Sequence, residues 1–168
     1  MNRALPLPER RGPRPTTTPT NPHTQLDQQP AAPIVAALAD ALLALPGVVE
    51  RPSAISVPGA RALWLAPVDA RGPRAAFMVG GEFAHLHPPP DSSLHAALPP
   101  SVASEAIARG WAEVHPVARM GLIPENVVMI YAPRDDSELR VVLDLIRSAL
   151  AFARGEHQDG GNKSRRRS

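Results

Sequence analysis

The chain has 168 residues, the usual size of one domain, and it contains no cysteine. Disulfide bonds, thiolate nucleophiles and cysteine-ligated zinc or iron–sulfur sites are therefore excluded. The net charge of +2 comes from the ends of the chain, because residues 1–30 and 155–168 carry +2 each while residues 31–154 carry −2. We interpret these basic ends as solvated termini and expect no specific nucleic-acid partner.

Both ends lack the apolar side chains that a folded core needs. Residues 1–30 contain seven prolines and almost no long apolar side chains, and residues 155–168 are polar and end in a basic run. Such segments cannot bury enough surface to offset the loss of chain entropy, so we expect both to be disordered. No apolar stretch approaches the ~18 residues of a membrane span, and the N-terminus lacks the apolar part of a secretory signal. These features favour a cytoplasmic protein.

Residues 31–154 show the hydrophobic periods of short helices and strands. In chain order they predict a helix (32–45), a hairpin (54–57 with 61–66), a long strand bulged at its glycines (75–87), two short helices (91–98 and 101–110), two strands (111–115 and 127–132) and a C-terminal helix (from the cap Asp135 to Gly155). The C-terminal helix has one apolar stripe, formed by Leu139, Val142, Leu143, Ile146 and Leu150. Strands flanked by helices predict an α+β fold, a single small domain with a mostly antiparallel sheet packed by helices.

Four of the six histidines lie close together in the sequence, at His85, His87, His95 and His115. Alternate residues of a strand point to the same face, so Phe83 is expected to share a face with His85 and His87, and Glu82 to point the other way. Pairing of this strand with the strand 111–115 would place His115 and Trp111 on the same surface, with the segment carrying His95 folded over it.

A histidine cluster of this kind suits three chemistries. Imidazoles exchange protons near neutral pH, ligate metal ions, and donate hydrogen bonds to an oxyanion. An H-x-H pair alone is also typical of a solvated strand edge or a hydrogen-bonded core. No P-loop, G-x-G-x-x-G or G-x-S-x-G motif occurs, so no organic cofactor is indicated, whereas a metal ion held by the histidines stays open.

Two further residues have both a functional and a structural interpretation. Trp111 could line an aromatic pocket, although core packing is the commoner role of a tryptophan in such a strand. Arg134 could bind an anion, or it could form a surface ion pair with Asp135 or Asp136.

Four segments resemble, in this order, one known family. They are Gly81 to His87, Asp91 to Leu98, Gly110 to Pro116, and Tyr131 to Arg134 before the C-terminal helix. Together they are similar to the fungal-luciferase-like domain. The resemblance implies a relation to an enzyme that oxidises a hydroxylated styrylpyrone with O₂, and it marks seven positions: Glu82, His85, His87, His95, Trp111, His115 and Arg134.

The resemblance and the histidines together predict a site with oxidoreductase-like chemistry on a phenolic, enolic or pyrone-type small molecule. A histidine base would form an enolate that O₂ attacks without an organic cofactor. The expected catalytic residues are His85, His87, His95 and Glu82, and the expected substrate-binding residues are Phe83, Trp111, His115 and Arg134. The alternative is a non-catalytic domain that binds a small molecule, a metal ion or another protein.

Overall fold

The computed structural model describes residues 6–156, so the expected disorder of the last residues lies almost entirely outside the described part of the chain. The helices and strands are, in chain order, α1 (Ala32–Leu43), β1 (Val48–Pro52), β2 (Arg61–Leu65), the 3₁₀ turn η1 (Arg74–Ala76), β3 (Glu82–Leu86), β4 (Leu94–Ala97), α2 (Pro100–Ala108), β5 (Ala112–Val114), α3 (Pro116–Arg119), β6 (Val127–Ile130) and α4 (Asp136–Ala153). None of the described helices is both long enough and apolar enough to cross a membrane.

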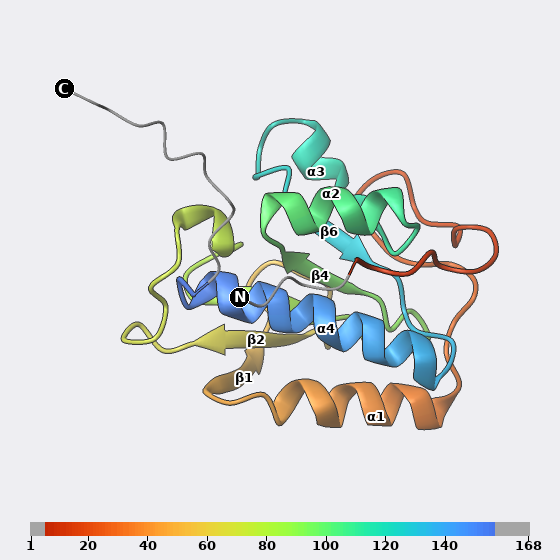
Figure 1. Cartoon of the computed structure of the whole chain (residues 1–168), viewed down its shortest axis with the longest axis horizontal. Helices are drawn as coiled ribbons and strands as arrows, with labels where there is room; N and C mark the ends of the chain where they lie inside the picture. The colour runs from red at the N-terminus through yellow and green to blue at the C-terminus, as the bar shows by residue number, and fades with distance from the viewer. Residues whose placement is uncertain (1–5, 157–168) are drawn as a thin grey trace.

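The strands form one six-stranded sheet in the order β1-β2-β3-β4-β6-β5, and each neighbouring pair is antiparallel. Helix α4 crosses the sheet over β3 and β4, with α1 beside it, while α2 packs near β5 (Figure 1). The predicted α+β class, with an antiparallel sheet covered by helices, is therefore confirmed.

Helix α4 holds the core together through the face it presents to the sheet. Asp135 caps its start by accepting a hydrogen bond from the backbone N–H of Glu138. Ile146 is fully buried in the core, as its place on the predicted stripe requires, whereas Leu143 is only half-buried. The buried face of α4 is rotated slightly from the predicted stripe, because Leu145 is buried in the core and Leu143, which was expected there, is not.

The segment that carries His95 is a strand, and the predicted helix over 91–98 is wrong. Strand β4 lies in the middle of the sheet between β3 and β6, and all four of its residues are buried. The helix propensity of its alanines is overridden because a central strand, covered on both faces, needs small apolar side chains. The predicted strand at 54–57 is also absent, since β1 pairs with β2 from residues 48–52 instead.

A bulge interrupts the pairing of β2 with β3 and reverses the faces expected for Glu82 and Phe83, while His85 and His87 still share one face. Leu63 lies opposite Ala84, but the next residue, Trp64, lies opposite Glu82, so Phe83 is the extra residue of the bulge. Glu82 therefore lies on the same face as His85, and Phe83 packs in the core. The neighbouring Gly81 permits this close pairing, since a Cβ there would lie 2.4 Å from the backbone oxygen of Leu65.

The N-terminal segment is the largest difference from the sequence-based expectation. Residues 6–30 run along the β5 and β6 side of the sheet and are held there by hydrogen bonds (Figure 1). Gln25 is 1% exposed and accepts a hydrogen bond from the backbone N–H of Ala132, and Arg14 donates to the carbonyl of Ala112 on the edge strand β5. The segment is ordered by polar contacts rather than by an apolar stripe, so hydrophobic periodicity gave no sign of it.

Candidate functional site

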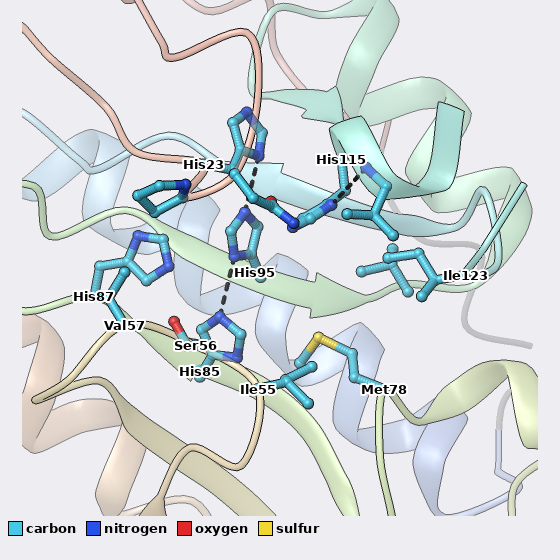
Figure 2. A pocket seen from close by; sticks show the side chains of 14 residues that line it. His23, Ile55, Ser56, Val57, Met78, His85, His87, His95, His115 and Ile123 are labelled. Atoms are coloured by element: carbon cyan, nitrogen blue, oxygen red, sulfur yellow. Dashed lines mark hydrogen bonds between the residues drawn. The ribbon is translucent and has the colours of Figure 1, made fainter. Parts of the chain in front are cut away.

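Five histidines converge on one cavity of about 540 Å³ (Figure 2). His85 on β3 and His95 on β4 are direct partners across neighbouring strands, and His87 follows β3 on the same face. His115 stands at the start of α3, directly after β5. His23 comes from the N-terminal segment and is 3% exposed.

Three of these imidazoles form a hydrogen-bonded chain between two carboxylates. Glu113 Oε1 lies 2.6 Å from His23 Nε2, and His23 Nδ1 lies 3.0 Å from His95 Nε2. On its other side, His95 Nδ1 lies 3.0 Å from His85 Nε2, and His85 Nδ1 lies 2.9 Å from Glu82 Oε1. Each imidazole therefore uses both ring nitrogens, and the chain joins β3, β4, β5 and the N-terminal segment.

The carboxylate of Glu82 is buried and fully engaged. It accepts hydrogen bonds from the Ser53 hydroxyl at 2.7 Å and from the backbone N–H of Ala54 at 3.1 Å, besides its contact with His85. A carboxylate held by several donors is fixed in position, and it holds the imidazole it contacts in one orientation.

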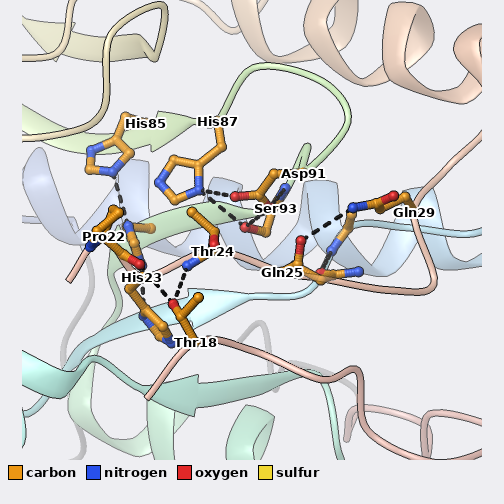
Figure 3. A network of polar contacts seen from close by, with 12 residues as sticks. Thr18, Pro22, His23, Thr24, Gln25, Gln29, His85, His87, Asp91 and Ser93 are labelled. Carbon is orange, nitrogen blue, oxygen red and sulfur yellow. Dashed lines mark hydrogen bonds and ion pairs between the residues drawn. The ribbon is translucent and has the colours of Figure 1, made fainter. Parts of the chain in front are cut away.

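His87 is oriented by a carboxylate of its own. Its Nδ1 lies 2.7 Å from Asp91 Oδ2, and the other oxygen of Asp91 accepts the backbone N–H of Ser93 at 3.0 Å (Figure 3). This arrangement leaves Nε2 of His87 for the cavity, next to the ring of His95, whose centroid is 4.7 Å away.

Among the described residues, the ring of His115 is held by a backbone N–H and not by a carboxylate or another histidine. Its Nδ1 accepts the backbone N–H of Val117 at 3.1 Å and so caps the short helix α3. A neutral imidazole that accepts at Nδ1 bears its proton at Nε2. His115 therefore presents a hydrogen-bond donor at Nε2.

Burial favours the uncharged form of three of these imidazoles, those of His85, His95 and His115. It lowers the pKa of His85, and it lowers the pKa of His95 well below the usual value, with the neighbouring histidines adding to the effect. Burial and the nearby histidines lower the pKa of His115 to about 4. At neutral pH these three rings therefore offer lone pairs and N–H groups rather than positive charge.

The rest of the cavity lining is largely aliphatic, and we call this part the aliphatic wall. Its side chains come from the loop after β1, from the segment before β3 and from the α3 to β6 region, namely Ile55, Val57, Met78, Val117, Ile123 and Val127. Figure 2 labels Ile55, Val57, Met78 and Ile123. A cavity with one imidazole wall and one aliphatic wall suits a flat molecule with an ionisable hydroxyl group.

The structure brings together five of the eight residues predicted for the site: Glu82, His85, His87, His95 and His115. Strand β5, which leads to His115, pairs with β6 and not with β3 as expected. Of the five, the four histidines line the cavity and Glu82 contacts His85, whereas the other three residues do not line the cavity. Phe83 is fully buried in the core because of the bulge, and Trp111 packs in the core with its indole N–H donated to the carbonyl of Pro8. Arg134 forms an ion pair with Glu138 rather than with Asp135 or Asp136.

Three polar residues of the site were missed in the sequence. His23 lies in the segment interpreted as disordered, and nothing in the local pattern marks it. Asp91 follows His87 at a spacing of four and stands where the sequence predicts the start of a helix. Glu113 alternates with His115 along the predicted strand, and that alternation was the available sign.

Two sets of three histidines have nitrogen atoms close enough to hold one metal ion. In the set of His85, His87 and His95 and in the set of His23, His95 and His115, the nitrogens lie within 4.8 Å of one another. His95 belongs to both sets.

Comparison with known proteins gives a match to the part of the chain that contains four of the five cavity histidines. Residues 80–149 match the family described as Luciferase domain. The luciferases of Armillaria ostoyae, Armillaria mellea and Neonothopanus nambi are 38%, 37% and 34% identical to the chain over 73 residues, which are 42% of this chain and 27% of each of those proteins. The chain thus matches only about a quarter of these relatives' length. No solved structure matches it.

Proposed function

We propose that the histidine-lined cavity is the active site of an oxygen-using enzyme, because four of its five histidines lie within residues 80–149, which match the family described as Luciferase domain. Its substrate is a phenolic, enolic or pyrone-type small molecule. The curated relatives are named luciferases and match this chain over 73 residues. The residues that match the family model, 80–149, contain β3 and β4.

The observation that carries this proposal is the contrast between the two walls of the cavity. The aliphatic wall takes up the flat carbon skeleton of the substrate, and the imidazole wall meets its hydroxyl group. The cavity volume of about 540 Å³ is within the range of small-molecule sites, about 300–1,000 Å³.

The chemistry follows from neutral imidazoles facing an acidic hydroxyl. An imidazole nitrogen takes the proton from the hydroxyl, and the substrate becomes an enolate. The enolate carbon then bonds to O₂, which receives the electron pair and becomes a peroxide bound to carbon, and the proton returns to the distal oxygen. The substrate is oxidised and O₂ is reduced, so no further reductant is consumed. The Nε2–H of His115 can donate a hydrogen bond to the enolate oxygen.

The test measures binding and oxygen uptake with a panel of hydroxylated pyrones and phenols. We expect at least one compound to bind and to cause oxygen uptake that depends on the protein. Ile123→Asp, which places a charge on the aliphatic wall, should weaken binding at least tenfold. Its matched control is Leu122→Asp, because Leu122 is 70% exposed and does not line the cavity.

Equal binding by the two variants would contradict the proposed location. Binding without oxygen uptake would instead favour a non-catalytic small-molecule-binding domain. That second function is supported by the hydrogen-bonded order of the cluster, in which both nitrogens of His23, His85 and His95 already have partners.

A further inference from the structure

We propose that His85, His87 and His95 bind one divalent transition-metal ion, with a further coordination position open to the cavity. The three side chains come from β3, the residue just after it, and the neighbouring strand β4, so the sheet itself holds them in place. This inference goes beyond the proposed function, because metal binding is measured without any substrate.

The positions of the nitrogen atoms suit a common ion. The three candidate ligand atoms lie within 4.8 Å of one another, and His85 Nε2 and His95 Nδ1 are 3.0 Å apart. With metal–nitrogen bonds of about 2.1 Å, neighbouring ligands of a six- or four-coordinate ion lie about 3.0 to 3.4 Å apart. Small rotations of the rings therefore bring all three nitrogens to bonding distance.

The second nitrogen of each proposed ligand has a hydrogen-bond acceptor. His85 Nδ1 faces Glu82 at 2.9 Å, and His87 Nδ1 faces Asp91 at 2.7 Å. An imidazole that donates from one nitrogen to a carboxylate has its lone pair on the other, which is the form that binds metal, and such carboxylate–histidine pairs typically accompany metal sites. In both residues this leaves Nε2 for the ion.

His95 is supported through two residues in series. When Nδ1 of His95 binds the ion, its Nε2–H donates to His23 Nδ1, which lies 3.0 Å away. His23 then bears its own proton at Nε2 and donates it to Glu113, 2.6 Å away. Every donor in this series has an acceptor, and every imidazole is neutral. His23 and Glu113 thus serve as hydrogen-bond partners that hold His95, one of the three metal ligands, in position.

The same reasoning decides against the second set of histidines. His115 accepts the backbone N–H of Val117 at Nδ1, so its proton is on Nε2 and neither nitrogen offers a free lone pair. His115 is also only partly buried, whereas His85, His87 and His95 are all buried. One ion at the set of His85, His87 and His95 is therefore favoured.

The ligand set indicates which ions fit. Neutral imidazoles favour zinc, iron, cobalt, nickel and copper, and they disfavour magnesium and calcium. The buried carboxylates of Glu82 and Asp91 balance the charge of a divalent ion. On the proposed function, the open position would take the substrate's hydroxyl oxygen, and the ion would favour loss of the hydroxyl proton to solvent as a Lewis acid, in place of proton transfer to a ligand imidazole.

The test uses the full chain without a histidine tag, freed of metal by a chelator. Calorimetric titration with Zn²⁺ and absorption spectroscopy with Co²⁺ should both show one ion per chain. His87→Gln should weaken Zn²⁺ binding at least 100-fold, and Asp91→Asn about 10- to 100-fold, the usual effect of losing an outer-shell partner. His115→Gln is the matched control and should bind within about twofold of the original chain.

Thermal unfolding of each variant shows whether it is folded. If His87→Gln does not fold, the comparison of Asp91→Asn with the original chain decides the test. No stoichiometric binding, or an equal loss in His115→Gln, would overturn the metal site. Metal binding without oxygen uptake would refute only the proposed reaction. Substrate turnover that is the same with and without chelator, in a chain that binds no Zn²⁺, would refute only the metal site.

Discussion

His23 and His95 are 72 residues apart in the chain, yet their imidazole nitrogens lie 3.0 Å apart in a buried contact. Their rings are stacked, with centroids 5.1 Å apart. One residue comes from a proline-rich N-terminal segment and the other from the centre of the sheet. The contact makes the N-terminal segment part of the site, so we infer that the folding unit begins before residue 31.

Deletion of residues 1–30 tests this inference directly. The truncation removes the partner of His95 and the hydrogen bonds that the segment makes to residues around β5. We expect a clearly lower melting temperature and weaker binding of Zn²⁺. A melting temperature within a few degrees of that of the full chain would show that the segment is dispensable for folding.

Gln25→Ala tests the same segment by a smaller change. Gln25 Oε1 accepts the buried backbone N–H of Ala132, and an N–H left without an acceptor costs about 1–3 kcal/mol of unfolding free energy. Gln29→Ala is the matched control, because Gln29 is exposed. Denaturant unfolding of both variants gives the comparison, and an equal loss in the two would contradict the buried role of Gln25.

Ile146→Ala and Leu143→Ala separate the two sides of the α4 stripe. Ile146 is fully buried, so its truncation should lower the free energy of unfolding by about 2–5 kcal/mol. Leu143 is half-buried, and the same truncation there should cost clearly less. Ile146→Ala should lower the free energy of unfolding more than Leu143→Ala, because it leaves a cavity in the core. A larger loss for Leu143→Ala in denaturant unfolding would disprove this.

Tyr131 should show its burial in a spectroscopic titration. Burial and the carboxylate of Glu113, which accepts its hydroxyl at 2.9 Å, raise the pKa of Tyr131 from 10.0 to about 12. It is the only tyrosine, so tyrosinate absorbance reports on it alone. We expect a midpoint near 12 in the folded chain and near 10 in denaturant.

The sign of the linked stability follows from these two values. Below pH 10 the phenol is neutral in both states and its contribution to stability is complete. Between pH 10 and 12 only the unfolded chain ionises, so stability falls as the pH rises. Tyr131→Phe should remove this part of the fall. A midpoint near 10 in the folded chain would contradict the buried hydroxyl.

Phe83→Ala tests the bulge. With Phe83 in the core, its truncation should cost about 3–5 kcal/mol of unfolding free energy. The affinity of the folded variant for Zn²⁺ should stay within about twofold, because Phe83 does not line the cavity. Calorimetry on the folded variant makes the comparison with His87→Gln. A large loss of affinity at unchanged stability would instead place Phe83 at the site, on the face that plain strand alternation predicts.

Some features of this protein follow from its sequence alone. The apolar stripe and the Asp135 cap predict α4, because helix periodicity and capping are local properties. The alternation of His85 and His87 predicts that they share a face, since a strand has a period of two. Short strands between helices predict the α+β class.

Other features depend on contacts between distant segments. The bulge that turns Glu82 toward His85 arises in the pairing of β2 with β3, and no local pattern places it at Phe83. Strand β4 replaces a predicted helix because its alanines fill a central position that is buried on both faces. His23 joins the site through polar contacts of an N-terminal segment without apolar periodicity. Only the tertiary structure brings these groups together, because hydrogen-bond partners 72 residues apart leave no trace in local periodicity.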